Sequence, residues 1–483
     1  MSLKQQAVSG LIWSFVDTFV GHGIGFVIGI LLARLLSPRE FGLIGMIVVF
    51  ITVSESFINS GFSNALIRKN NCTQADYSTV FYYNLAAGLA FFFILFASAP
   101  AIAKFLKEPE LQTIVQVLGV ILIIDSLTMV QRTILIKRID FKLQARISVI
   151  SSLGSGIVAI AMAYSGFGVW SLVAQRLCRQ ALHSLLLWIW NRWKPTLEFS
   201  TQSFRELFGF GSKLLVSGLI DTAYNNIYYL IIGKFFSAQE LGFYARADEF
   251  SKIPSQNLNG IIGRVSYPVL AIIQNDIPRL KLNYQKLIRS TMFITFILML
   301  GMAAVAEPMI IVLIGEKWRP SIIYLRMLCF VGMMYPLHAL NLNMLQVQGR
   351  SDLFLKLEII KKILAIPIII IGVAWGIKVM IAGMMVNTLI AYYLNSYWSG
   401  RMIGYSFKDQ LKDIGPSFFF ALLMSATVFI AGYYLPTAYL VKLMIQLMIG
   451  AAFVIAASEL FQLRDYLYIK SLLVEKLKAE NNG

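Results

Sequence analysis

Residues 31–43 read LLARLLSPREFGL, and residues 231–243 read IIGKFFSAQELGF. A serine, a glutamate and a glycine of the first stretch recur 200 residues later, and most remaining pairs are apolar in both (Ser37/Ser237, Glu40/Glu240, Gly42/Gly242). Weaker echoes follow in the same order, such as Phe167-Gly168-Val169 with Trp375-Gly376-Ile377. Several matches in one order near one offset indicate an internal duplication.

The composition of the whole chain is that of a membrane protein. Its 483 residues are 58% hydrophobic and 14% charged, with mean hydropathy +0.70, whereas about a quarter of the residues in a soluble domain are charged. Runs of about 20 apolar residues recur, which is the length that crosses roughly 30 Å of hydrocarbon. Short segments alternating at period 2, typical of a membrane barrel, are not evident. The sequence therefore predicts an all-α membrane protein.

Fourteen membrane helices are expected. The first apolar run, Leu11 to Leu36, is too long for the core of a signal peptide and has no convincing cleavage site, so we expect the mature protein to keep it. The predicted helices are 11–36, 41–62, 79–100, 111–131, 145–165, 168–190, 209–236, 241–262, 288–314, 320–347, 355–374, 377–399, 415–434 and 438–461.

The repeat predicts how these helices are grouped. Each copy holds six helices, an even number, so both copies enter the membrane in the same direction and are related by a pseudo-twofold axis along the membrane normal. We expect a six-helix bundle at 1–196, a second at 197–404, two extra transmembrane helices at 405–463 and a cytoplasmic tail at 464–483. A cavity is expected between the bundles.

The net charge of +17 is accounted for by membrane topology. With a cytoplasmic N-terminus, the loops on that side and the termini carry roughly three times as many Lys and Arg as the opposite side. Both termini are therefore expected in the cytoplasm, and anionic lipid headgroups can accept the loop charges. No nucleic-acid partner is needed to explain the basic balance.

Metal, cofactor and enzymatic chemistry find little support in the sequence. The three cysteines (Cys72, Cys178, Cys329) and three histidines (His22, His183, His338) have no spacing typical of disulfide frameworks or metal sites. A phosphate-binding GxxxxGK[ST] loop is also missing. We therefore expect no metal, no cofactor and no catalytic residues.

Four charges fall inside a predicted membrane helix, in the stretch FYARADEFSKIPSQ at 243–256. At about 100° per residue, Arg246, Asp248, Glu249 and Lys252 share one helical face, and the aromatic residues share the other. Each charge at the bilayer centre costs on the order of 3 kcal/mol. One interpretation is a hydrated cavity in which Arg246 and Lys252 contact an anionic cargo while Asp248 and Glu249 hold them. The alternative is that the charges pair internally and only fix helix packing.

Other predicted membrane helices also carry polar stripes. Arg176, Arg179 and His183 follow i, i+3, i+7 spacing, so Arg176 and Arg179 are further candidates for substrate binding. Asp17, Glu55 and Asp221 are candidates for ion coupling. Arg132 lies at a predicted helix end, where its side chain is expected to reach the membrane interface.

Four segments carry a resemblance to a known family: LLSPREFGL at 35–43, GFYARADEFSKIPSQNL at 242–258, RVSYPVL at 264–270 and IGEKWRPS at 314–321. The sequence resembles the polysaccharide transport family of the multidrug/oligosaccharidyl-lipid/polysaccharide flippase superfamily, the exporters of O-antigen, capsule and colanic-acid type. The resemblance extends over nearly the whole chain and carries over, among site residues, only the region around Arg246.

The resemblance implies a flippase of the bacterial inner membrane. Such a protein moves polyprenyl-diphosphate-linked oligosaccharides by alternating access, driven by proton or sodium gradients, and it works with a polymerase and glycosyltransferases of the same pathway. Ion-coupled efflux of small molecules on the same fold is the first alternative. A membrane polysaccharide polymerase or ligase is a remote one, because the predicted outer loops are short.

Overall fold

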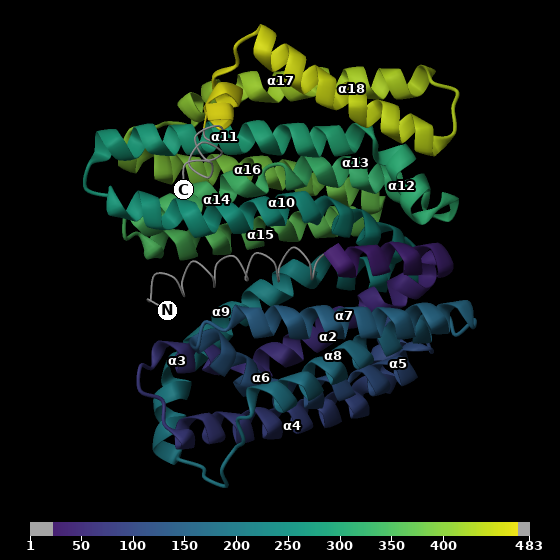
Figure 1. The fold of residues 1–483 in the computed structure, drawn as a ribbon, viewed down its shortest axis with the longest axis vertical. Coiled ribbons are helices and arrows are strands. Elements are labelled where there is room, and N and C mark those ends of the chain that lie inside the picture. Colours follow the sequence, from purple (N-terminus) through teal and green to yellow (C-terminus); the bar gives the residue numbers. More distant parts are fainter. Residues whose placement is uncertain (1–22, 472–483) are drawn as a thin grey trace. The chain divides into compact units, whose positions relative to one another are not determined.

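The fold comes from a computed structural model that describes residues 23–471, leaving aside the side chains of 256–265, 267, 268 and 351. Throughout residues 23–471 the regular structure is helical, and no strand occurs there (Figure 1). Nine helices of this described part are long and apolar enough to cross a membrane, the first at Pro38–Arg68 and the last at Tyr439–Leu460. The predicted all-α membrane class is confirmed.

The chain divides into two compact units, with the boundary between Gly242 and Phe243. The first unit begins, in its described part, with a helix at Gly23–Leu35. It continues with α2 (Pro38–Asn59), α3 (Phe62–Arg68), α4 (Gln74–Leu106), α5 (Leu111–Leu118), α6 (Val120–Lys137), α7 (Phe141–Tyr164), α8 (Val169–Asn191) and α9 (Thr201–Phe235). Helix α10 (Ala238–Ile272) starts in this unit and runs into the next.

The second unit holds the rest of α10 and the helices that follow it. These are α11 (Ile277–Ala304), α12 (Ala306–Ile314), the short 3₁₀ helix η1 (Glu316–Trp318), α13 (Ser321–Gly332), α14 (Tyr335–Val347), α15 (Ser351–Trp375), α16 (Ile377–Ile403), α17 (Phe407–Tyr434) and α18 (Tyr439–Leu460).

Several segments predicted as single helices are broken. The predicted helix 41–62 ends at Asn59, because Ser60 and Gly61 both take left-handed backbone conformations with φ of 43° and 70°. The segment 111–131 is split at Gly119 into α5 and α6, and α6 continues to Lys137. The segments 288–314 and 320–347 are each divided as well. Hydropathy reports apolar content, whereas helix ends depend on caps and local backbone conformation.

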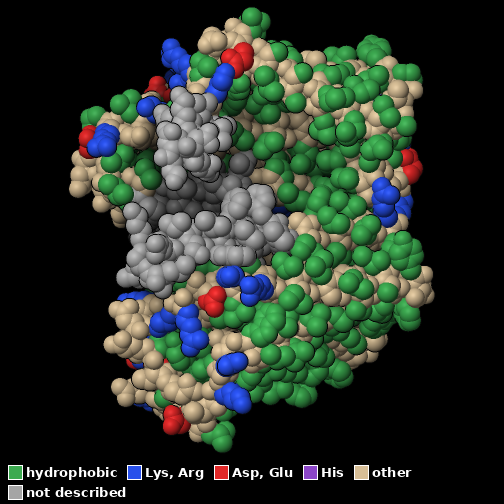
Figure 2. Space-filling view, in the orientation of Figure 1, with side chains coloured by type: hydrophobic (Ala, Val, Ile, Leu, Met, Phe, Trp, Pro, Cys, Tyr) green, Lys and Arg blue, Asp and Glu red, His purple; other side chains and the backbone are tan. Residues whose placement is uncertain are grey.

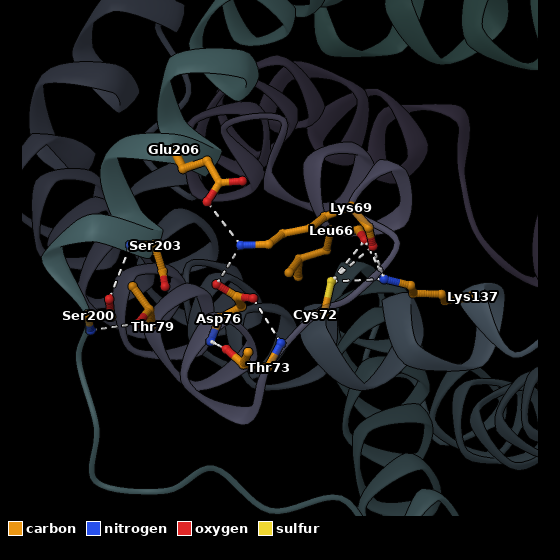
Figure 3. Close-up of polar contacts among 10 residues, drawn as sticks. All are labelled: Leu66, Lys69, Cys72, Thr73, Asp76, Thr79, Lys137, Ser200, Ser203 and Glu206. Atoms are coloured by element: carbon orange, nitrogen blue, oxygen red, sulfur yellow. Dashed lines mark hydrogen bonds and ion pairs between the residues drawn. The ribbon is translucent and has the colours of Figure 1, made fainter.

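The linker between α8 and α9 is fastened to the first unit rather than loose. Gln74 and Gln131 donate side-chain hydrogen bonds to the carbonyls of Lys194 (2.7 Å) and Trp193 (2.8 Å). At its end, the Ser200 N–H donates to the Thr79 hydroxyl over 2.9 Å (Figure 3). These bonds hold the start of α9 against α4, and α9 then packs along α2.

The second unit has its own packed interior, to which α17 and α18 belong. Helix α17 packs on α11, and α18 packs on α17 and α12. Buried Met424 and Val428 of α17 meet Val305 and Leu443. After α18, Asp465 accepts hydrogen bonds from Arg289 of α11 and Ser417 of α17, each over 3.1 Å. Helices α17 and α18, which lie outside the predicted repeat, are thus joined to the second unit.

The outer surface is that of a protein surrounded by lipid. Figure 2 shows apolar side chains over broad areas of the visible face. In α18, Leu440, Met444 and Met448 are each more than half exposed. The domain boundaries predicted at 196/197, 404/405 and 463/464 stay predictions.

Candidate functional site

A polar cavity of about 600 Å³ lies inside the first unit. Four helices build it: α2, α3, α6 and α8. Its lining side chains are Ile51, Glu55, Asn59, Ser63, Ile121, Asp125, Thr128, Met129, Arg132, Thr133, Ile136, Arg176, Arg179, Gln180 and His183. The cavity is therefore bounded by helices of a membrane protein and yet lined by many polar groups.

Two carboxylates face this cavity from different helices. Asp125 of α6 accepts a hydrogen bond of 2.7 Å from the Gln180 amide of α8. Glu55 of α2 is close enough to Asp125 for their negative charges to repel, and Arg176 of α8 offsets this with an attractive charge. The pair is thus an acidic spot with one amide and one guanidinium as neighbours.

Three arginines outnumber the two acids. Arg132 comes from α6, while Arg176 and Arg179 come from α8, where the i, i+3 spacing brings them to the same side as His183. The side chains of Arg132 and Arg179 are exposed, so the basic part of the lining is accessible. Guanidinium groups have forked donors that match phosphate and carboxylate oxygens. The cavity can therefore bind an anion at its arginines, and the carboxylates of Glu55 and Asp125 compete with that anion for them.

The structure brings three of the predicted site residues together here: Glu55, Arg176 and Arg179. Asp221 is exposed on α9 and is not part of this lining. Asp17 lies outside the described residues.

The charges of FYARADEFSKIPSQ form two ion pairs along α10, in the second unit. The Arg246 guanidinium lies 2.5 Å from the Glu249 carboxylate, and the Lys252 ammonium lies 2.5 Å from the Asp248 carboxylate. The side chains of Arg246 and Asp248 are 11% and 7% exposed, whereas that of Glu249 is 48% exposed. The opposite face is buried, with Phe243 packed edge-on against Trp318. Each basic group of this stretch is thus paired with an acidic group of the same helix.

A second polar cluster in the second unit did not emerge from the sequence. The His338 ring of α14 lies 3.3 Å from the Asn395 amide of α16. Lys361 of α15 pairs with Glu358 of the same helix and acts electrostatically on His338. The i, i+3 spacing of Glu358 and Lys361 within an apolar helix is the signal that could have revealed it.

Arg132 lines the cavity, which was not predicted. The helix end expected at residue 131 is wrong, because α6 runs on to Lys137, while the expected place of the Arg132 side chain at the membrane interface stays a prediction. Asp125, Asn59 and Ser63 were likewise not predicted as site residues, and the i, i+4 spacing of Glu55 and Asn59 was the available signal. Among the described residues, no group of three His, Cys, Asp or Glu side chains is placed to hold a metal ion.

Comparison with known proteins shows the family to which the chain belongs. The sequence model described as "Polysaccharide biosynthesis protein" matches residues 31–323. The lipopolysaccharide biosynthesis protein WzxC of Escherichia coli (strain K12) is 26% identical over 429 residues, 87% of each chain. The fold is similar to that of the lipid II flippase MurJ in an inward closed conformation, with TM-score 0.76 and 14% identity over 94% of this chain and 99% of that one. An inward-facing multidrug resistance transporter of the MATE family has TM-score 0.63 and 14% identity, over 82% and 98% of the two chains.

Proposed function

Because the chain belongs to the polysaccharide biosynthesis protein family, we propose that it is a flippase for polyprenyl-diphosphate-linked oligosaccharides in surface polysaccharide assembly. The relative named for lipopolysaccharide biosynthesis and the fold similarity to a lipid II flippase both support this function. A transporter rather than an enzyme is proposed, acting beside the glycosyltransferases and polymerase of its pathway.

The observation that carries the proposal is the arginine-rich cavity inside the first unit. Three guanidinium groups face the cavity, which offers about 600 Å³. Charged groups inside a membrane protein are costly and typically serve transport pathways. A diphosphate is the anionic part of the proposed substrate, and its oxygens suit the forked donors of Arg176 and Arg179. Arg246 and Lys252 of α10 are proposed as further substrate contacts, held by their acidic partners.

Fourteen membrane spans are part of the proposal. Helices α8, α9, α10 and α15 have 23, 35, 35 and 25 residues, and about 20 residues cross a bilayer. Their charged residues keep their hydropathy low, as expected of helices that line a hydrated pathway. Together with the segment that starts before Gly23, they would complete two six-helix bundles related by a pseudo-twofold axis and two extra helices.

The proposed location is the bacterial inner membrane, with both termini in the cytoplasm. The excess of Lys and Arg in the loops on one side of the predicted topology supports this orientation. Fusions of alkaline phosphatase and green fluorescent protein to residues 71 and 436 test it. Fluorescence at the first position and phosphatase activity at the second are expected, and the reverse pattern contradicts the orientation.

Ion coupling is proposed to involve Glu55, with Asp17 and Asp221 as further candidates. Glu55 lines the same cavity as Asp125 and Arg176, so a cation bound between the two acids would weaken the attraction of Glu55 for the arginine. Arg176 would then be available to the anionic substrate. Glu55→Gln is expected to make transport independent of the ion gradient, and an unchanged gradient dependence contradicts this role.

The substrate contact is tested in proteoliposomes with a fluorescent polyprenyl diphosphate trisaccharide. Loss of one charge-assisted hydrogen bond costs about 1.5–3 kcal/mol, so Arg176→Ala and Arg179→Ala should each lower the flipping rate roughly 10-fold or more. Arg279→Ala is the matched control, because Arg279 is an exposed arginine in the first turn of α11, outside the cavity. Normal rates in both cavity variants contradict the contact. Failure of the unmodified protein to move any polyprenyl diphosphate contradicts the function itself.

Efflux of small molecules is the second candidate, favoured by the fold similarity to the multidrug transporter. Transport of a cationic dye by the same proteoliposomes, without movement of the lipid substrate, would support it. The excess of arginines in the cavity speaks against a cationic cargo, because like charges repel.

A further inference from the structure

A cysteine and a lysine of the first unit meet beside the end of α3. The Lys137 ammonium, at the C-terminus of α6, lies 2.8 Å from the sulfur of Cys72, in the loop before α4 (Figure 3). The two residues are 65 positions apart in the chain and belong to one compact unit. Tertiary packing therefore holds a nucleophilic amine against an oxidisable sulfur.

The same two backbone carbonyls bind both groups. The ammonium donates to the carbonyl oxygens of Leu66 (3.0 Å) and Lys69, and the Cys72 thiol donates to the same oxygens over 3.3 Å each. These carbonyls belong to the last turn of α3 and to the residue that follows it, where a helix leaves acceptors without intrahelical partners. Capping of α3 thus explains why the amine and the sulfur lie side by side.

A second amine of this region, that of Lys69, is engaged elsewhere. Its ammonium lies 3.2 Å from the Asp76 carboxylate and 3.0 Å from that of Glu206. In Figure 3 the Lys69 side chain extends toward these acids and away from Cys72. The hydrogen bond to Glu206 raises the pKa of Lys69, which keeps this amine protonated, and a protonated amine cannot attack sulfur. Lys137 is therefore the amine placed to react with the thiol.

Small molecules can reach the pair from solvent. Cys72 and Lys137 are each half-buried, and Asn71 and Thr73 on either side of the cysteine are exposed. In the proposed topology this loop faces the cytoplasm, where thiols are kept reduced. The free thiol is thus the ordinary form of Cys72, and its chemistry needs an added oxidant.

We propose that Cys72 and Lys137 form a sulfur–nitrogen cross-link, a sulfenamide, when a hydroperoxide reaches the loop. In the first step the thiol reduces hydrogen peroxide to water, the O–O bond breaks, and Cys72 becomes a sulfenic acid. The neutral Lys137 amine then attacks the sulfur, so that an S–N bond forms and the S–O bond breaks. The hydroxide leaves with the amine proton as a second water. A thiol reductant reverses the cross-link by attacking the sulfur.

The cross-link fastens the end of α6 to the loop before α4, close to the polar cavity. Thr133, about one helical turn before Lys137, lines the cavity and donates a 3.1 Å hydrogen bond to Ser63 of α3, another lining residue. The bond therefore holds the cavity walls formed by α3 and α6 at this spacing. It is a redox modification of the cavity walls and does not depend on the cargo.

Peptide mapping of the full chain in detergent micelles, after exposure to hydrogen peroxide, tests the cross-link. We expect a peptide containing Cys72 joined to one containing Lys137, with the mass of their sum less two hydrogen atoms. Dithiothreitol should return both peptides to their original masses. Oxidation of Cys72 to a sulfinic acid without a bond to any lysine overturns the proposal, as does a bond to Lys69 in place of Lys137.

Lys137→Arg is the matched variant, because arginine keeps the positive charge and the donors that cap α3 but stays protonated. The cross-linked fraction should fall at least tenfold, and dimedone should trap the sulfenic acid of Cys72 instead. Cys178 of α8 is the internal control, since it is also half-buried, and it should join no lysine. Equal cross-linking in the arginine variant overturns the proposal. If that variant does not fold, the masses from the unmodified chain decide the question alone.

Discussion

One ammonium group joins three helices of the first unit, and its removal should destabilise the fold. Lys69, directly after α3, lies 3.2 Å from the Asp76 carboxylate of α4 and 3.0 Å from the Glu206 carboxylate of α9 (Figure 3). The two acids differ sharply in environment. The Asp76 side chain is 1% exposed, while that of Glu206 is 57% exposed.

This difference sets the size of the expected effects. Breaking a buried ion pair costs about 3–5 kcal/mol. Without Lys69, the Asp76 carboxylate still accepts a 2.9 Å hydrogen bond from the Thr73 N–H. Lys69→Met should therefore lower the free energy of unfolding by a smaller amount, about 2–3 kcal/mol. Glu206→Gln removes only an exposed pair and should cost below about 1 kcal/mol. Adding Asp76→Asn to Lys69→Met removes the buried charge and should restore at least half of the loss.

Equilibrium unfolding in mixed detergent micelles measures all four proteins under one condition. Equal losses for Lys69→Met and Glu206→Gln would refute the reasoning, because burial would then not decide the cost. A double variant as unstable as Lys69→Met alone would refute it as well, because the buried charge would not be the cause.

Three further predictions use the same preparations. Gly349→Ala should lower the free energy of unfolding by about 1–2 kcal/mol, because its φ of +71° is strained for alanine, while the new Cβ meets no atom within 4 Å. Gly218→Ala is the control, since that position is equally open but helical, and it should cause no loss. Equal losses would contradict a backbone origin of the effect. Arg132→Ala should slow flipping roughly tenfold or more in proteoliposomes, and a normal rate removes it from the pathway. Arg319→Ala removes a 2.9 Å hydrogen bond to the Tyr439 hydroxyl at the start of α18. It should speed proteolysis between α17 and α18 while lowering the free energy of unfolding by less than about 1 kcal/mol. Unchanged cleavage contradicts this anchoring role.

The residues of the cavity show how far sequence reasoning reaches. Helical spacing predicted that Arg176 and Arg179 share a side of one helix, and both line the cavity. The same reasoning did not predict that Arg132 lines the cavity, because it ended the helix at residue 131, whereas the segment is divided at Gly119 and its second helix extends to Lys137. It also could not predict the hydrogen bond between Gln180 and Asp125, because these residues are 55 positions apart and meet only through the packing of α6 on α8.

The sequence by itself determined the membrane class and the positions of most described helices, and it predicted a duplication, because apolar length, helical period and repeat spacing are local properties of the chain. Only the tertiary structure decided which polar side chains share a cavity, and that Gly42 meets the backbone of Ala238 while Gly242 meets that of Pro38. Those facts depend on where helices break and which helices pack together, and such contacts join residues far apart in the chain. A periodic pattern shows which face of a helix is polar, but it does not show what that face meets.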